Sequence, residues 1–138
     1  MIHLVTGGSG SGKSAYAEQC ILDFGGTRRV YIATMQPFGA EGQARIARHR
    51  KMRAAKKFST IECYTNLKEV ELEPGSDVLL ECMSNLTANE IFDPSGAGKA
   101  RTEEEILAGV SRLAHQARNL VLVTNEIFSD GYRYEEET

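Results

Sequence analysis

The stretch Gly7-Gly8-Ser9-Gly10-Ser11-Gly12-Lys13-Ser14 decides the fold, because it has the G-x-x-x-x-G-K-S spacing of a phosphate-binding loop. Residues 2–5 before it form a short apolar run and predict a buried parallel strand. Residues 15–24 after it predict a helix, since apolar side chains recur on one side at Ala17, Cys20, Ile21 and Phe24. The loop therefore occurs in the strand–turn–helix context that its chemistry requires.

Each residue type in this loop suits a triphosphate ligand. Glycines at 7, 8, 10 and 12 carry no Cβ, so backbone N–H groups can surround phosphate oxygens at the positive end of the following helix. Lys13 offers a cation to the β- and γ-phosphates, and Ser14 offers a hydroxyl to Mg²⁺. We predict that every residue of the loop, from Gly7 to Ser14, contacts a nucleotide.

Length and composition indicate one globular domain. The chain has 138 residues, of which 41% are hydrophobic and 25% charged, and we expect residues 1–138 to form a single nucleotide-binding domain. We find no apolar stretch long enough to span a bilayer and no signal peptide, so we expect a cytoplasmic protein. The three widely spaced cysteines predict buried, reduced thiols rather than disulfides or a zinc site.

The charge is unevenly distributed along the chain. The net charge is −3, yet residues 42–61 contain seven Lys or Arg and no Asp or Glu. This asymmetry predicts a local anionic partner and argues against a surface that binds nucleic acid in general.

The rest of the chain alternates strands with helices. Strands are predicted at residues 29–34, 59–64, 78–82 and 119–124, and helices at 41–57, 85–92 and 102–117. For the basic helix, a sparse apolar side is expected from Ala44, Ile46 or Ala47, and Met52; for the last helix, Thr102 is expected as N-cap with Glu105 three residues on. The pattern predicts an α/β fold of the P-loop NTPase-like, RecA-type class, with a mostly parallel sheet between two helical layers.

Several polar residues are expected at one rim of this sheet, beyond the carboxyl ends of the strands. Thr34, Glu81 and Asn125-Glu126 each follow or end an apolar strand. Glu81 is the candidate second carboxylate of the site, which would hold Mg²⁺ or accept the proton of an attacking hydroxyl. Glu62 could accept hydrogen bonds from the N1–H and N2–H₂ groups of guanine. Ordinary loop polarity would account equally well for Glu62 and Asn125-Glu126.

His49 lies in the basic run between Arg45 and Arg53. Five neighbouring cations are expected to lower its pKa, because like charge disfavours the imidazolium. A neutral imidazole is a nucleophile, and the same cations would offset charge on a phosphate under attack. A solvated basic helix with an incidental histidine, or an RNA-binding patch, fits the spacing as well.

The ordered set of motifs resembles the bifunctional adenosylcobinamide kinase / adenosylcobinamide-phosphate guanylyltransferase family of cobalamin (vitamin B12) synthesis. The motifs that carry the resemblance are residues 5–14, Tyr31-Ile32-Ala33-Thr34, Arg45 to Arg53 with His49, Thr60-Ile61-Glu62, Leu79-Leu80-Glu81-Cys82 and Val123-Thr124-Asn125-Glu126. The phosphate loop alone is shared by many families, whereas the ordered set covers nearly the whole chain.

The resemblance implies two reactions. ATP or GTP phosphorylates the aminopropanol arm of adenosylcobinamide, and GTP then guanylylates a histidine, which falls on His49, before GMP passes to adenosylcobinamide phosphate. Lys13 and Glu81 are the other implied catalytic residues, with Mg²⁺ held at Ser14 and Glu81. The implied nucleotide contacts beyond the loop are Ala33, Thr34, Met35, Arg50, Lys51, Met52, Arg53, Glu62 and Glu81. The family also implies a homotrimer.

The chain departs from the family pattern at several positions. Ala54 stands where members often have proline, no tryptophan precedes Thr60, and residues 127–131 differ from the family's glycine-rich continuation. The family's final helix and strand are not found. These differences concern the corrinoid end of the site more than the nucleotide end.

Two other functions remain open on the sequence. A small-molecule kinase with one activity would use the phosphate loop and carry the basic helix as a lid. A non-enzymatic NTP-dependent switch or RNA-binding protein would use the basic run, although the absence of aromatic residues within that run counts against single-strand binding.

Overall fold

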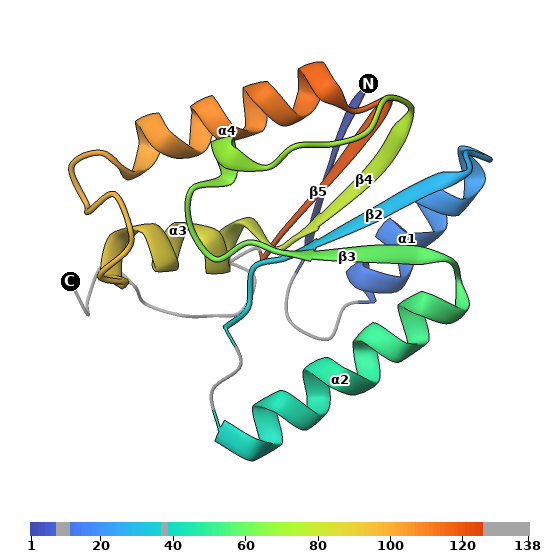
Figure 1. The fold of residues 1–138 in the computed structure, drawn as a ribbon, viewed down its shortest axis with the longest axis horizontal. Coiled ribbons are helices and arrows are strands. Elements are labelled where there is room, and N and C mark those ends of the chain that lie inside the picture. Colours follow the sequence, from blue (N-terminus) through green and yellow to red (C-terminus); the bar gives the residue numbers. More distant parts are fainter. Residues whose placement is uncertain (8–11, 37–38, 126–138) are drawn as a thin grey trace.

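A parallel sheet of five strands forms the centre of the part of the chain that the structure describes (Figure 1). The structure is a computed structural model that describes residues 1–7, 12–36 and 39–125, without the side chains of Arg45, His49 and Asn125. In chain order the elements are β1 (Ile2–Gly7), α1 (Lys13–Asp23), β2 (Arg28–Ala33), α2 (Gly39–Ala55), β3 (Phe58–Glu62), the 3₁₀ helix η1 (Leu67–Glu69), β4 (Ser76–Glu81), α3 (Met83–Phe92), α4 (Thr102–Gln116) and β5 (Asn119–Asn125). Every predicted helix and strand is present, with ends shifted by a few residues, and the predicted α/β fold is confirmed.

The strands are ordered β1-β5-β4-β2-β3, and all four neighbouring pairs are parallel. The strand of the phosphate loop, β1, and the strand that ends in Glu81, β4, are therefore separated by β5. Helices α3 and α4 lie on one side of the sheet, and α1 and α2 on the other (Figure 1). This arrangement confirms the three-layer architecture predicted from the alternating pattern.

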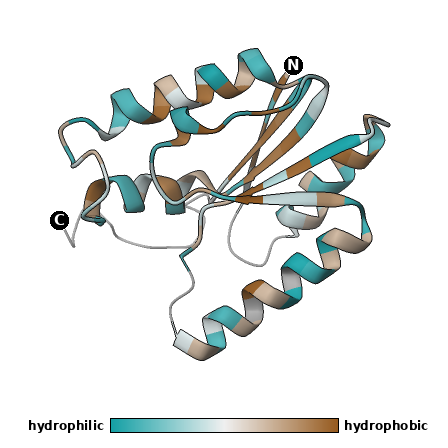
Figure 2. Cartoon of the chain, in the orientation of Figure 1, coloured by the Kyte–Doolittle hydropathy of each residue, from teal (hydrophilic) through white to brown (hydrophobic). Residues whose placement is uncertain are grey.

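Alternation along the strands builds a core on each face, because successive side chains point to opposite sides. On one face, even-numbered residues such as Ile32 and Leu80 pack with Leu86 of α3 and Leu113 of α4. On the other face, odd-numbered residues pack against α1, among them Tyr31, Leu79, Val121 and Val123. Figure 2 shows hydrophobic residues along the central strands and a mixed surface on the helices.

The expectation that residues 2–5 are buried is wrong for two of them. Ile2 and Leu4 are 54% and 64% exposed, whereas Val5 packs against the core that includes α1. Among the described strands, β1 pairs with β5 alone. Val5 on one face of β1 packs in the core that includes α1, whereas Ile2 and Leu4 on the opposite face are exposed in the described part of the chain.

The start of α4 also differs from the expectation. Arg101 occupies the N-cap position, and Thr102 is the first helical residue, whose hydroxyl donates to the carbonyl of Gly98 at 2.8 Å. Glu105 does not close a capping box. Its carboxylate instead pairs with Lys68 at 2.7 Å and Arg101 at 3.0 Å, and these pairs lower its pKa.

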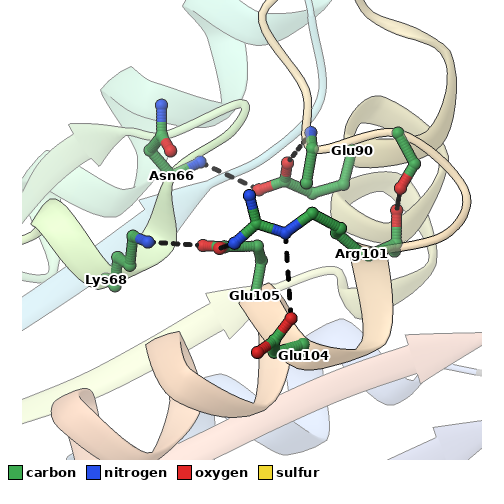
Figure 3. A network of polar contacts seen from close by, with 9 residues as sticks. Asn66, Lys68, Glu90, Arg101, Glu104 and Glu105 are labelled. Atoms are coloured by element: carbon green, nitrogen blue, oxygen red, sulfur yellow. Dashed lines mark hydrogen bonds and ion pairs between the residues drawn. The ribbon is translucent and has the colours of Figure 1, made fainter.

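A buried carboxylate anchors the chain that follows β3 (Figure 3). Glu90 is 2% exposed, and its oxygens accept the backbone N–H groups of Asn66 and Ala97, both at 2.9 Å. The burial of this charge is offset by two hydrogen bonds to its ionised form. Glu90 thereby ties the segment after β3 to the loop after α3, and so fixes the end of β3 at which Glu62 lies.

The prediction of buried thiols is confirmed for two of the three cysteines. Cys63 and Cys82 are buried, Cys20 is partly buried, and none forms a disulfide. Burial raises the pKa of Cys63 to about 11 and raises that of Cys82, so both thiols stay protonated near neutral pH.

The described residues contain no group of three or more His, Cys, Asp or Glu that could hold a metal ion. No described helix is both long and apolar enough to cross a membrane.

Gly109 of α4 gives a test of how closely η1 packs on this helix. A Cβ at Gly109 would lie 2.7 Å from Cβ of Leu67, whereas a Cβ at Gly42 of α2 would meet nothing within 4 Å. Gly109→Ala should lower the free energy of unfolding by about 1–3 kcal/mol through overpacking. Gly42→Ala should raise it by roughly 0.5–1 kcal/mol, because alanine is the better helix former. Urea denaturation of both variants measures the difference, and equal stabilisation by the two substitutions would contradict the packing described.

Candidate active site

The carboxyl ends of the strands form one rim, as predicted. Gly7 is paired with Asn125, and Ala33 is paired with both Glu62 and Glu81. The backbone positions of the predicted rim residues therefore lie in a row along the sheet. Glu126 and residues 8–11 of the phosphate loop fall outside the described residues.

The described part of the loop leads directly into α1. Gly12 has φ of +83°, a conformation that glycine adopts without the strain a Cβ would bring. Lys13 is the first residue of α1 and Ser14 the second, so both lie in its first turn. This is the end of a helix at which backbone N–H groups favour an anion.

A cavity of about 240 Å³ opens beside Lys13 at the rim. Its walls come from the ends of β2, β3 and β4, from the first turns of α1 and α3, and from α2. The lining residues are Lys13, Tyr31, Ala33, Met35, Ile46, Arg53, Glu62, Glu81, Cys82 and Asn85. Six of them are residues that the sequence predicted for the nucleotide site: Lys13, Ala33, Met35, Arg53, Glu62 and Glu81.

Glu81 is held from two sides. One carboxylate oxygen, Oε2, accepts the hydroxyl of Ser14, and the other, Oε1, accepts the phenol of Tyr31 at 3.1 Å. Burial, followed by the nearby Glu81 charge, strongly raises the pKa of Tyr31, so the phenol keeps its proton and acts as the donor. A hydroxyl and a carboxylate in contact are the oxygen ligands that Mg²⁺ takes together with substrate phosphates.

Arg53 brings a buried cation to the cavity. The side chain is 5% exposed, and its guanidinium lies 3.5 Å from the ring centroid of Tyr31. Its Nε is buried without a hydrogen-bond partner among the described residues. The expectation that Met52 lies on the buried side of α2 is wrong. Met52 is 62% exposed, and the neighbouring Arg53 is buried instead.

The other predicted cations of α2 lie elsewhere. Arg50 pairs with Glu62 across to β3, with side-chain exposures of 48% and 42%. An ion pair so open to water contributes little to stability, although it joins two predicted site residues. Lys51 and Met52 are exposed, and neither lines the cavity.

Thr34 is completely buried behind the rim. Its hydroxyl lies 2.8 Å from both the N–H and the carbonyl oxygen of Cys82, accepting from the first and donating to the second. The carbonyl of Thr34 in turn accepts the side-chain amide of Asn89 at 2.8 Å. These bonds lock the ends of β2 and β4 together, so in this structure the hydroxyl serves the backbone that carries Glu81.

His49 is described only by its place in the helix. Its side chain lies outside the described residues. Residue 49 follows Ile46 by three positions and precedes Arg53 by four, so the 3.6-residue period places it on the side of α2 that carries these two lining residues.

Sequence reasoning missed Tyr31 and Asn85 as site residues. Tyr31 was recognisable as a polar-tipped side chain in the apolar half of its strand, two residues before the strand's end, where its hydroxyl needs a partner. Asn85 lies in the first turn after β4, and its backbone N–H donates to the sulfur of Cys82 at 3.5 Å. No periodicity in the sequence marks Asn85.

Substitutions at Thr34 test its backbone role. Thr34→Val keeps the shape but leaves the N–H of Cys82 without an acceptor, and should lower the free energy of unfolding by about 1–3 kcal/mol. Thr34→Ser keeps the hydroxyl and removes one methyl group, with an expected loss of roughly 1 kcal/mol. Chemical denaturation compares the two. A valine variant as stable as the parent protein would show that the hydroxyl is dispensable for the fold.

Comparison with known proteins identifies the family. Residues 3–136 match the family model described as CobU, cobinamide kinase / cobinamide phosphate guanyltransferase. The chain is 35% identical over 140 aligned positions to the bifunctional adenosylcobalamin biosynthesis protein CobU of Escherichia coli (strain K12), with 92% of this chain and 76% of that protein covered. The protein of the same name from Salmonella typhimurium (strain LT2) matches with the same identity and coverage. The family resemblance predicted from the ordered motifs is thus confirmed, and the chain belongs to the cobinamide kinase / cobinamide phosphate guanyltransferase family.

Proposed function

We propose that this chain is a transferase that phosphorylates adenosylcobinamide and then transfers GMP from GTP to the phosphorylated product through His49. The observation that carries the proposal is the cavity in which Lys13 and Glu81 from the sheet rim meet Arg53 from the helix that bears His49. Family membership supports the two reactions, and the shared cavity supports the proposal that one triphosphate would contact both sets of residues.

In the kinase reaction, the hydroxyl of the aminopropanol arm attacks the γ-phosphorus. A bond forms between that oxygen and phosphorus, and the bond from the γ-phosphorus to the bridging β,γ-oxygen breaks to release the nucleoside diphosphate. Lys13 neutralises charge on the β- and γ-oxygens. Glu81, fixed by Ser14 and Tyr31, lies among the cavity residues and can accept the hydroxyl proton.

The side chains of Ser14 and Glu81 suit Mg²⁺ as ligands. Ser14 and Glu81 would hold it together with the phosphates, as the contact between their oxygens allows. When bound, the ion would neutralise charge that develops on the phosphate oxygens.

In the guanylyltransferase reaction, a ring nitrogen of His49 attacks the α-phosphorus of GTP and pyrophosphate leaves. A phosphate oxygen of adenosylcobinamide phosphate then attacks the same phosphorus and frees the imidazole. The cations Lys13 and Arg53 oppose the negative charge that builds on the phosphate oxygens. Arg53 suits this task because its charge is buried and lies beside a ring instead of a carboxylate.

The remaining expectations belong to the same proposal. We propose a homotrimeric assembly, which the family resemblance supports, a single nucleotide-binding domain, which the length and composition support, and a cytoplasmic location. Among the predicted nucleotide contacts, Glu62, Met35 and Ala33 at the cavity wall are the candidates to contact the base.

A labelling experiment tests the histidine. Incubation with Mg²⁺ and GTP labelled at the α-phosphate should leave label on the protein, and GTP labelled at the γ-phosphate should not. His49→Asn should abolish the α-label, since it removes the nucleophile. Arg112→Gln, which removes an exposed cation on α4, should label like the parent protein.

The other outcomes distinguish the alternatives. Label retained by His49→Asn would overturn the assignment of the nucleophile. A parent protein that transfers the γ-phosphoryl group but takes no α-label would indicate a kinase with one activity. Steeply salt-dependent RNA binding without either transfer would favour the RNA-binding alternative.

A further inference from the structure

We propose that Tyr31 positions two of the charged groups of the cavity: its hydroxyl orients Glu81, and its ring face orients the guanidinium of Arg53. Tyr31 is 7% exposed, lies on β2, and contributes to the cavity wall. The expected effect on catalysis rests on the proposed function. The expected effects on GTP and Mg²⁺ binding rest on the two contacts of Tyr31 and are measured without turnover.

The hydroxyl restricts the carboxylate. Tyr31 donates to Oε1 of Glu81 at 3.1 Å while Ser14 donates to Oε2. With both oxygens engaged, rotation of the carboxylate plane breaks at least one hydrogen bond. Without the phenol, Oε1 loses its donor. Of these two hydrogen bonds, only the one from Ser14 to Oε2 then remains.

The ring restricts the guanidinium without neutralising it. Arg53 lies 3.5 Å above the ring centroid, a cation–π geometry, and the described residues show no carboxylate within ion-pair distance of it. A carboxylate partner would consume the N–H donors and the charge. A ring holds the flat guanidinium by its face and leaves its edge donors for an anion in the cavity.

These two contacts can be separated by substitution. Tyr31→Phe removes the hydroxyl and keeps the ring, so it should affect Glu81 and spare Arg53. Tyr31→Leu removes both contacts. Arg53→Lys keeps the positive charge but not the planar stack, so it should reproduce only the ring effect. Tyr16→Phe removes an exposed phenol and serves as the matched control.

Calorimetric titration of GTP, with EDTA and with Mg²⁺, is the primary measurement. In EDTA, Tyr31→Phe should bind GTP within about twofold of the parent protein, whereas Tyr31→Leu and Arg53→Lys should bind roughly 5–30-fold more weakly, the range expected for a desolvated cation–π contact. With Mg²⁺, the gain in GTP affinity should fall by about tenfold or more in Tyr31→Phe, as for a lost hydrogen bond to a charged group. Tyr16→Phe should match the parent protein in both buffers.

Kinetics supply the second measurement. Tyr31→Phe should lower kcat of phosphoryl transfer with little change in KM for adenosylcobinamide, and should raise the Mg²⁺ concentration needed for half the maximal rate. A double variant of Tyr31→Leu with Arg53→Lys should bind GTP in EDTA no more weakly than either single variant, because each single variant already removes the contact between the ring and the guanidinium.

Several results would overturn the inference. If Mg²⁺ raises the GTP affinity of Tyr31→Phe as much as that of the parent protein, the hydroxyl does not position Glu81. If the losses of GTP affinity in the double variant are additive, the ring does not position Arg53. If Tyr31→Leu does not fold, Tyr31→Phe and Arg53→Lys still test the two contacts separately. A parent protein that binds GTP but catalyses neither reaction would contradict the proposed function and leave the binding test valid.

Discussion

The hydrogen bonds to the carboxylate of Glu81 hold the rim of the sheet together. This carboxylate lies at the end of β4, two strands away from β1, which leads into the phosphate loop. Ser14 reaches it from α1 and Tyr31 from β2, so three elements are connected through one ionised group. Both oxygens of this partly buried carboxylate therefore have a hydrogen-bond donor.

The backbone behind Glu81 is fixed by a second set of bonds. Thr34 closes the gap between the ends of β2 and β4, and Glu90 anchors the chain after β3 through Asn66. Hydrogen bonds between the strand ends and the segments after them thus hold the sheet side of the site. Helix α2, in contrast, contributes no residue to either hydrophobic core of the described chain. The helix that carries His49 is attached through Arg53 on Tyr31 and through the exposed pair of Arg50 and Glu62.

The sequence predicted most of the fold because apolar runs and turn residues are local signals. It failed where the answer depends on neighbours in space. The exposure of Ile2 and Leu4 depends on which elements pack on that face of β1, which the strand itself does not encode. A motif was enough to predict Lys13, which lines the cavity, as a candidate site residue. The sequence carries no such signal where an aromatic ring from another element decides which side of a helix is buried. Counting apolar residues on α2 selects Met52, yet a tyrosine face on β2 accommodates Arg53 instead.

The buried arginine also bears on why one cavity would serve two reactions. A kinase site of this fold needs the phosphate loop, a magnesium ligand and a proton acceptor, and under the proposed function Lys13, Ser14 and Glu81 would take these roles. A desolvated guanidinium costs several kcal/mol unless a partner offsets it, and a ring offsets only part of that. Arg53 is therefore difficult to explain as a stabilising residue of the free protein. It is explained if an anionic ligand supplies the missing partner on the side of the cavity next to α2, which is where transfer from an α-phosphate to His49 would require a cation.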